Sequence, residues 1–203
     1  MKKTFILTLI FIFIFPVYLL SFEDLGKEVC SKFLEGYLKK NSEVIIQSLS
    51  LPSEFFDEVV KYEAKKGGVS EEKIKKDITQ FLKIQKEVFE DCIFGYLPIS
   101  RYGEIKDFPE KRLQKIFYLD ILNDEEKFHF QDRLFCRKYL FMTVTDSYKK
   151  RYCYMEVCKV KEYSKLWIDR FAIYGSPYDS NLKALKCFME KMKFLLEKAK
   201  PPQ

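Results

Sequence analysis

The chain has one histidine, His129, and acid–base chemistry would have to start there. A neutral imidazole beside a carboxylate can act as a general base. Asp132 and Asp169 are the acids that folding could bring to it. If the three side chains converge in one pocket, they predict a small enzyme. The alternative is a surface or strand-edge histidine without a catalytic role.

Other catalytic signatures do not occur in the sequence. It contains no GxSxG, HExxH, P-loop or GxGxxG pattern, so no cofactor is predicted. Asp169 and Arg170 are adjacent in a predicted strand, where successive side chains point to opposite faces. One of the two charges should therefore face the covered side of the sheet, where it would need a partner.

The six cysteines offer a second kind of chemistry. An even number of cysteines in an exported chain indicates disulfides. There is no CxxC pair, and Cys153 and Cys158 are expected on opposite faces of one strand. With a single histidine as well, no metal site is predicted. The cysteines are Cys30, Cys92, Cys136, Cys153, Cys158 and Cys187.

The N-terminus has the composition of a secretory signal. Two lysines precede an apolar run at residues 5–20, and Ser21 and the first acids follow it. The run has about 16 residues, fewer than the roughly 20 that a membrane-spanning helix needs. We therefore expect a signal peptide at 1–21 and an extracytoplasmic domain, periplasmic or secreted, at 22–203. The alternative is an uncleaved segment that anchors the protein in the membrane.

The composition is that of one globular domain. Apolar residues make up 47% of the chain, which suffices for a core, and the net charge is +6. Basic residues alternate with acidic ones and form no patch or stripe, so nucleic-acid binding is not predicted.

Helices are expected in the first half and at the C-terminus. Apolar residues recur at helical spacing, and Ser70 with the acids after it is typical of a helix start. Gly67 and Gly68 are typical of a helix end. The predicted helices cover residues 22–40, 42–50, 53–67, 70–92 and 181–198.

Strands are expected between these helices, separated by turn residues. They cover residues 112–121, 135–145, 149–160 and 166–174, with a further start at 128–130 after a turn at 123–126. The predicted fold class is α+β: N-terminal helices packed on an antiparallel β-meander, with an added C-terminal helix.

The central hairpin predicts one disulfide. A three-residue turn at 146–148 would set Cys136 opposite Cys158, and Lys138 opposite Glu156 as an attractive pair. We therefore expect a Cys136–Cys158 bond. The next expected pair is Cys30 with Cys92, both on predicted helices.

Two segments carry a resemblance to a known family. The run CSKFLEGYLKKN at 30–41 resembles the opening helix of exported NTF2-like (cystatin-like α+β) domains, and the strand at 166–169, with Trp167, resembles a late strand of that family. The resemblance implies a cone-shaped sheet that can hold a ligand, form an enzyme pocket or serve as an interaction module. The three-helix start, the C-terminal helix and the six cysteines depart from the family, and no catalytic residue carries over.

These observations favour an exported, non-enzymatic domain that binds a ligand or an envelope protein. A small envelope enzyme that uses His129 and an acid is one alternative. A membrane-tethered structural protein is the other, and it requires that the signal segment is retained, since that segment supplies the only expected membrane contact.

Overall fold

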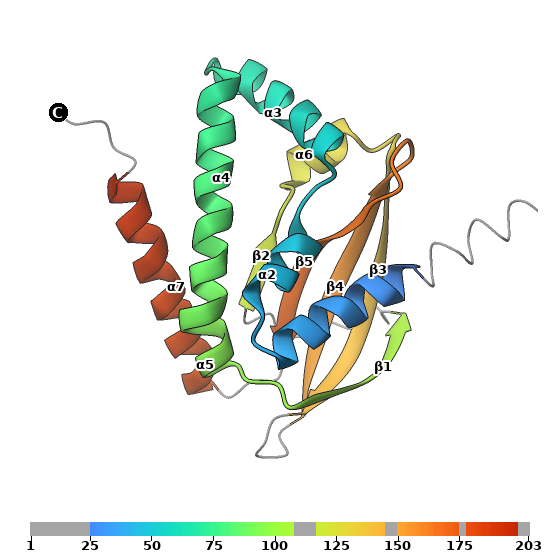
Figure 1. The fold of residues 1–203 in the computed structure, drawn as a ribbon, viewed down its shortest axis with the longest axis vertical. Coiled ribbons are helices and arrows are strands. Elements are labelled where there is room, and N and C mark those ends of the chain that lie inside the picture. Colours follow the sequence, from blue (N-terminus) through green and yellow to red (C-terminus); the bar gives the residue numbers. More distant parts are fainter. Residues whose placement is uncertain (1–24, 108–116, 145–149, 175–177, 199–203) are drawn as a thin grey trace, which may run out of the picture.

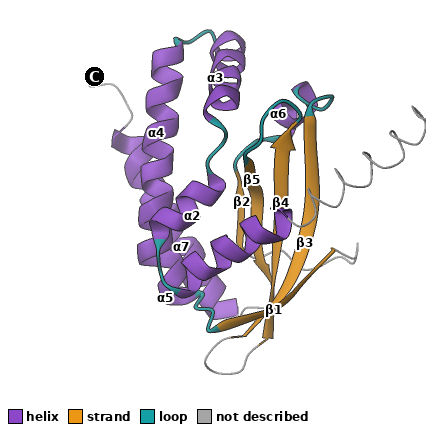
Figure 2. Cartoon of the chain, turned by 45° about the vertical axis from the view of Figure 1, so that its right-hand side comes forward, coloured by secondary structure: helices purple, strands orange, loops and turns teal. Residues whose placement is uncertain are grey.

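The structure is a computed structural model that describes residues 25–107, 117–144, 150–174 and 178–198. Helices and an antiparallel sheet form separate layers (Figure 1 and Figure 2), which confirms the α+β class. The expected signal segment lies outside the described residues. After a helix at 25–38, the elements are α2 (Ser42–Leu49), α3 (Ser53–Gly67), α4 (Glu71–Val88), a π-helical turn (Phe89–Ile93), α5 (Phe94–Tyr96), β1 (Arg101–Asp107), β2 (Phe117–Asp120), α6 (Asp124–His129), β3 (Leu134–Val144), β4 (Lys150–Val160), β5 (Leu166–Tyr174) and α7 (Tyr178–Lys198).

The sheet has five antiparallel strands in the order β1-β3-β4-β5-β2. The meander β3-β4-β5 forms its centre, and β1 and β2 are the two edges. Cys136 lies opposite Cys158 and Lys138 lies opposite Glu156, which is the predicted hairpin register. The predicted turn at 146–148 is outside the described residues.

One strand prediction is wrong, and one strand was not predicted. Residues 128–130 were expected to begin a strand. Phe128 and His129 are instead the last residues of α6, and Phe130 caps it. A reciprocal capping box between Asn123 and Glu126 stabilises this short helix. The edge strand β1 was not expected, because its residues are mostly polar and show no clear alternation. The strand expected at 112–121 is described only over β2.

The helix boundaries follow from local signals. Ser70 caps α4 by accepting a hydrogen bond from the backbone N–H of Lys73. α3 ends at Gly68, which has a left-handed φ of 62° that favours glycine. The two helices form a hairpin, and α3 crosses near α6 at one end of the sheet (Figure 1).

The main core lies between the sheet and the helices on one side of it (Figure 2). Phe33 from the helix at 25–38 packs on Phe171 of β5, with 4.8 Å between ring centroids. Phe89 joins the same group of fully buried rings. A smaller cluster surrounds Trp167 at the end of the sheet and includes Phe55 of α3 and Phe130.

Two disulfides hold the fold. Cys136 is bonded to Cys158, as the hairpin register predicted. The predicted Cys30–Cys92 pair is wrong, because Cys92 is bonded to Cys187 and Cys30 is a buried free thiol. The reason is tertiary: α7 lies against α4 and the π-helical turn, and so brings Cys187 to Cys92.

Candidate functional site

The structure separates the histidine from the buried acid. His129 ends α6, is exposed, and stacks on Tyr62 with 4.1 Å between ring centroids. Asp169 is fully buried in β5. Asp132 is exposed in the turn that follows α6. Lys127, two residues before His129, is the α6 residue that pairs with Asp169. Because helix positions two apart do not share a face, α6 presents lysine and not histidine to this acid.

A β-bulge explains how an aspartate comes to be buried in the sheet. Arg170 lies opposite Glu156 and Ile168 lies opposite Val157, so Asp169 is the extra residue between two paired positions. Bulges redirect side chains. Oδ1 of Asp169 accepts hydrogen bonds from Trp167 Nε1 at 3.3 Å and from the backbone N–H of Leu122 at 3.1 Å.

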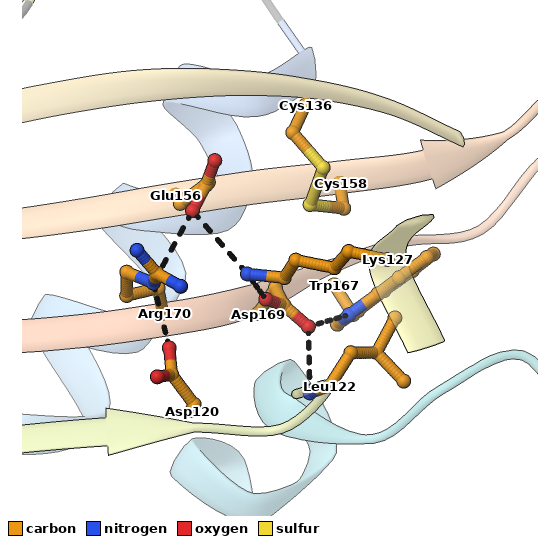
Figure 3. The surroundings of a disulfide bond; sticks show 9 residues. All are labelled: Asp120, Leu122, Lys127, Cys136, Glu156, Cys158, Trp167, Asp169 and Arg170. Carbon is orange, nitrogen blue, oxygen red and sulfur yellow. Dashed lines mark hydrogen bonds and ion pairs between the residues drawn. A yellow bond between two sulfur atoms is a disulfide. The ribbon is translucent and has the colours of Figure 1, made fainter. Parts of the chain in front are cut away.

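Charged neighbours complete a network on this face of the sheet (Figure 3). Lys127 pairs with Asp169 and lies 3.5 Å from a carboxylate oxygen of Glu156. Arg170 contacts the same oxygen of Glu156 at 3.5 Å and Asp120 at 2.6 Å. Burial raises the pKa of Asp169, and Lys127 opposes that shift. Each charge has a partner, so the network fixes α6 on the sheet and leaves no free acid or base.

An apolar cleft lies beside this network. It has a volume of about 650 Å³ and lies between α3, α4, the α2–α3 junction and the segment from β2 to α6. A more open hollow, of about 590 Å³, is lined by Tyr62, Phe128 and His129 among others. The cleft has the more apolar lining, which includes Leu51, Phe56, Ile74, Ile78, Phe81, Leu82 and Ile121.

The apolar wall of the cleft belongs to the first half of the continuous helix that α4 forms with the π-helical turn, residues 71–93. Ile74, Ile78 and Phe81 recur every three or four residues, so they share one face of the helix. They are only half-buried, whereas Ile84 and Val88, further along the same helix, are buried in the core. One apolar stripe along this helix therefore faces the cleft over one part of its length and the main core over the other.

Carboxyl groups outnumber basic groups in the cleft. Glu63, Asp77 and Glu126 line it, with Lys165 as the cation. Glu126 is only 7% exposed. Burial raises the pKa of Glu126, and the nearby charge of Glu63 raises it further. Oε1 of Glu63 is buried and has no hydrogen-bond partner within the described part of the chain.

Sequence reasoning predicted the helix that carries the apolar wall, from apolar residues at helical spacing, and singled out Asp169, but it did not single out Glu63 or Glu126. The capping box at Asn123 and Glu126 was the available signal for the second glutamate, because the pattern Asn-x-x-Glu begins many helices. Nothing in the sequence indicates that α3 carries Glu63 to the same cleft.

Three further findings concern metal ions, the membrane and similarity to known proteins. Among the described residues, no group of His, Cys, Asp or Glu side chains is arranged to hold a metal ion. The described helices include none with the length and apolar character needed to cross a membrane. Comparison of the chain with protein-family models, with curated proteins and with solved structures finds no match.

Proposed function

We propose that the protein is an exported, non-enzymatic binding domain whose cleft holds a small apolar ligand. The observation that carries the proposal is the half-buried stripe of Ile74, Ile78 and Phe81 along a cleft of about 650 Å³. Pockets for small molecules commonly have volumes of roughly 300–1,000 Å³ with mostly apolar linings. An apolar face left partly in water is unfavourable by roughly 25 cal/mol per Å², and a ligand would cover it.

Export is supported by the two disulfides, which form and persist outside the cytoplasm, and by the signal-like composition of residues 1–21. The resemblance to exported NTF2-like domains is consistent with a ligand-binding role and remains a prediction. Intact mass of the protein isolated from its native envelope tests the export, because a cleaved signal removes about 20 residues. A full-length mass would favour the membrane-tethered alternative.

Binding is tested with the neutral fluorescent probe N-phenyl-1-naphthylamine and the disulfide-intact protein. We expect saturable fluorescence enhancement, and about tenfold weaker binding for Phe81→Ala, since each factor of ten corresponds to about 1.4 kcal/mol of lost contact. Phe56→Ala, on the α3 wall of the cleft, should weaken binding in the same direction.

The matched control is Met189→Ala on α7, an exposed apolar side chain outside the cleft. It should leave probe binding unchanged. The proposal fails if the wild type does not bind the probe, or if Met189→Ala weakens binding as much as the two cleft variants do.

A further inference from the structure

We propose that the ligand is a single-chain amphiphile with a cationic amine head, which lies at Glu63 and Glu126 while its alkyl chain follows Ile78 and Phe81 of α4. This inference rests on the proposed binding function and adds the chemical class of the ligand. It follows from three observations: the cleft has more acidic than basic groups, one oxygen of Glu63 has no partner among the described residues, and the neighbouring lysines contact other groups.

The two glutamates face the cleft from different elements. Glu63 belongs to α3 and Glu126 to α6, and both are lining residues. Oε2 of Glu126 already accepts a hydrogen bond from the backbone N–H of Asn123, at 2.7 Å. Oε1 of Glu63 has no partner among the described residues although it is buried. A buried carboxylate oxygen without a partner is unfavourable, and an ammonium group supplies up to three donors.

Three lysines near the two glutamates form ion pairs or hydrogen bonds with other groups. Lys66 pairs with Glu125, and Lys127 pairs with Asp169 and Glu156. Lys165, which lines the cleft, donates to the backbone oxygen of Leu51 at 3.4 Å. None of these contacts satisfies Oε1 of Glu63. The positive charge that complements the two glutamates would therefore come from the ligand.

The same charges discriminate among head groups. An alkyl carboxylate would place a further negative charge beside Glu63 and Glu126, and like charges repel each other. An alcohol can donate one hydrogen bond but carries no charge, and charge-assisted hydrogen bonds are the stronger ones. For equal chains, the expected order of affinity is amine, then alcohol, then carboxylate.

The test uses displacement of N-phenyl-1-naphthylamine by dodecylamine, dodecan-1-ol and dodecanoate at neutral pH, each below its micelle concentration or, for the alcohol, its solubility limit. We expect dodecylamine to bind at least about tenfold more tightly than the alcohol, and dodecanoate to bind most weakly. Glu63→Gln should remove most of the advantage of the amine and leave the affinity for the alcohol unchanged.

The control is Glu72→Gln, which removes one exposed carboxylate of α4 that does not line the cleft. It changes the net charge of the protein by the same amount as Glu63→Gln but leaves the cleft intact. The advantage of the amine should therefore be kept. If dodecanol displaces the probe but dodecylamine is no better, the head-group assignment is wrong and the binding function stands. If Glu72→Gln removes the advantage equally, the assignment is also wrong. If no amphiphile displaces the probe and the probe itself does not bind, both proposals are wrong.

Discussion

α4 and the π-helical turn form one continuous helix over residues 71–93, and its two halves carry similar apolar stripes in different surroundings. Ile74, Ile78 and Phe81 in the first half remain half-buried along the cleft. Val88, and Phe89 of the π-helical turn that follows, are fully buried in the main core. The second half therefore contributes its apolar surface to the core, whereas Ile74 and Ile78 keep theirs at the cleft. Phe81 lies between the two surroundings, because it lines the cleft and also packs against the main core. The contrast shows that a regular stripe indicates a covered face but does not say what covers it.

The largest expected effect contrasts one phenylalanine from each half. Phe89→Ala should lower the free energy of unfolding by about 3–5 kcal/mol, because it leaves a cavity among buried rings. Phe81→Ala should cost about 1–2 kcal/mol, because that side chain is already partly in water. Urea unfolding of both variants, with the disulfides intact, measures the difference. Equal losses would break the comparison, because Phe81 would then contribute as much to the core as Phe89 does.

Removing the disulfide at the core half should have the next largest effect. Cys92 and Cys187 are 95 residues apart in the sequence, and a cross-link that closes a long loop restricts the unfolded chain strongly. The double variant Cys92→Ala/Cys187→Ala should lose about 2–4 kcal/mol of stability. Probe binding under folding conditions should be unchanged, because neither residue lines the cleft.

The corresponding double variant at Cys136 and Cys158 is the control. That bond spans only 22 residues within a hairpin that is already paired, so its removal should cost less. Stability is measured by urea unfolding, as above. A larger loss of stability at the hairpin would contradict the prediction that the Cys92–Cys187 bond, which holds α7, stabilises the fold more strongly.

The smallest expected effect is a pH dependence that arises from Glu126 of α6, on the other side of the cleft from the long helix. Burial and the charge of Glu63 raise the pKa of Glu126 in the folded state. Asp169 also raises it and Lys66 lowers it. A folded-state pKa above the unfolded one means that the folded protein binds this proton more tightly. The resulting stabilisation is complete below the unfolded pKa and is lost as pH rises through the folded pKa. Relative to Glu126→Gln, the wild type should therefore lose stability as pH rises from the unfolded pKa, about 4.3, through the raised folded pKa.

Glu58 provides the control with the opposite sign. Its pKa is lowered, chiefly by hydrogen bonds from Arg133, with Tyr163 contributing. Relative to Glu58→Gln, the wild type should lose stability as pH falls through the lowered pKa. Urea unfolding at several pH values measures both differences. The same sign for both glutamates would contradict the assignment of a desolvated carboxyl to the cleft.

The sequence by itself determined the local elements and one long-range contact. Gly68 marks the end of α3 and Ser70 marks the start of α4, each through a hydrogen bond to a residue a few positions away. The assumed three-residue turn at 146–148 and the pairing of Lys138 with Glu156 predict the register that joins Cys136 to Cys158. These features were predictable because capping and cross-strand pairing across a short turn depend on neighbours in the sequence.

Only the tertiary structure decided the other contacts. Cys187 reaches Cys92 because α7 returns to the π-helical turn, which spacing along the chain does not encode. Asp169 was expected as a charge that would need a partner, but its pairing with Lys127 depends on a bulge in β5 and on the short helix α6. Glu63 and Glu126 come to one cleft from α3 and α6. Each of these contacts joins residues far apart in sequence, so its formation depends on the packing of whole elements and not on local preference.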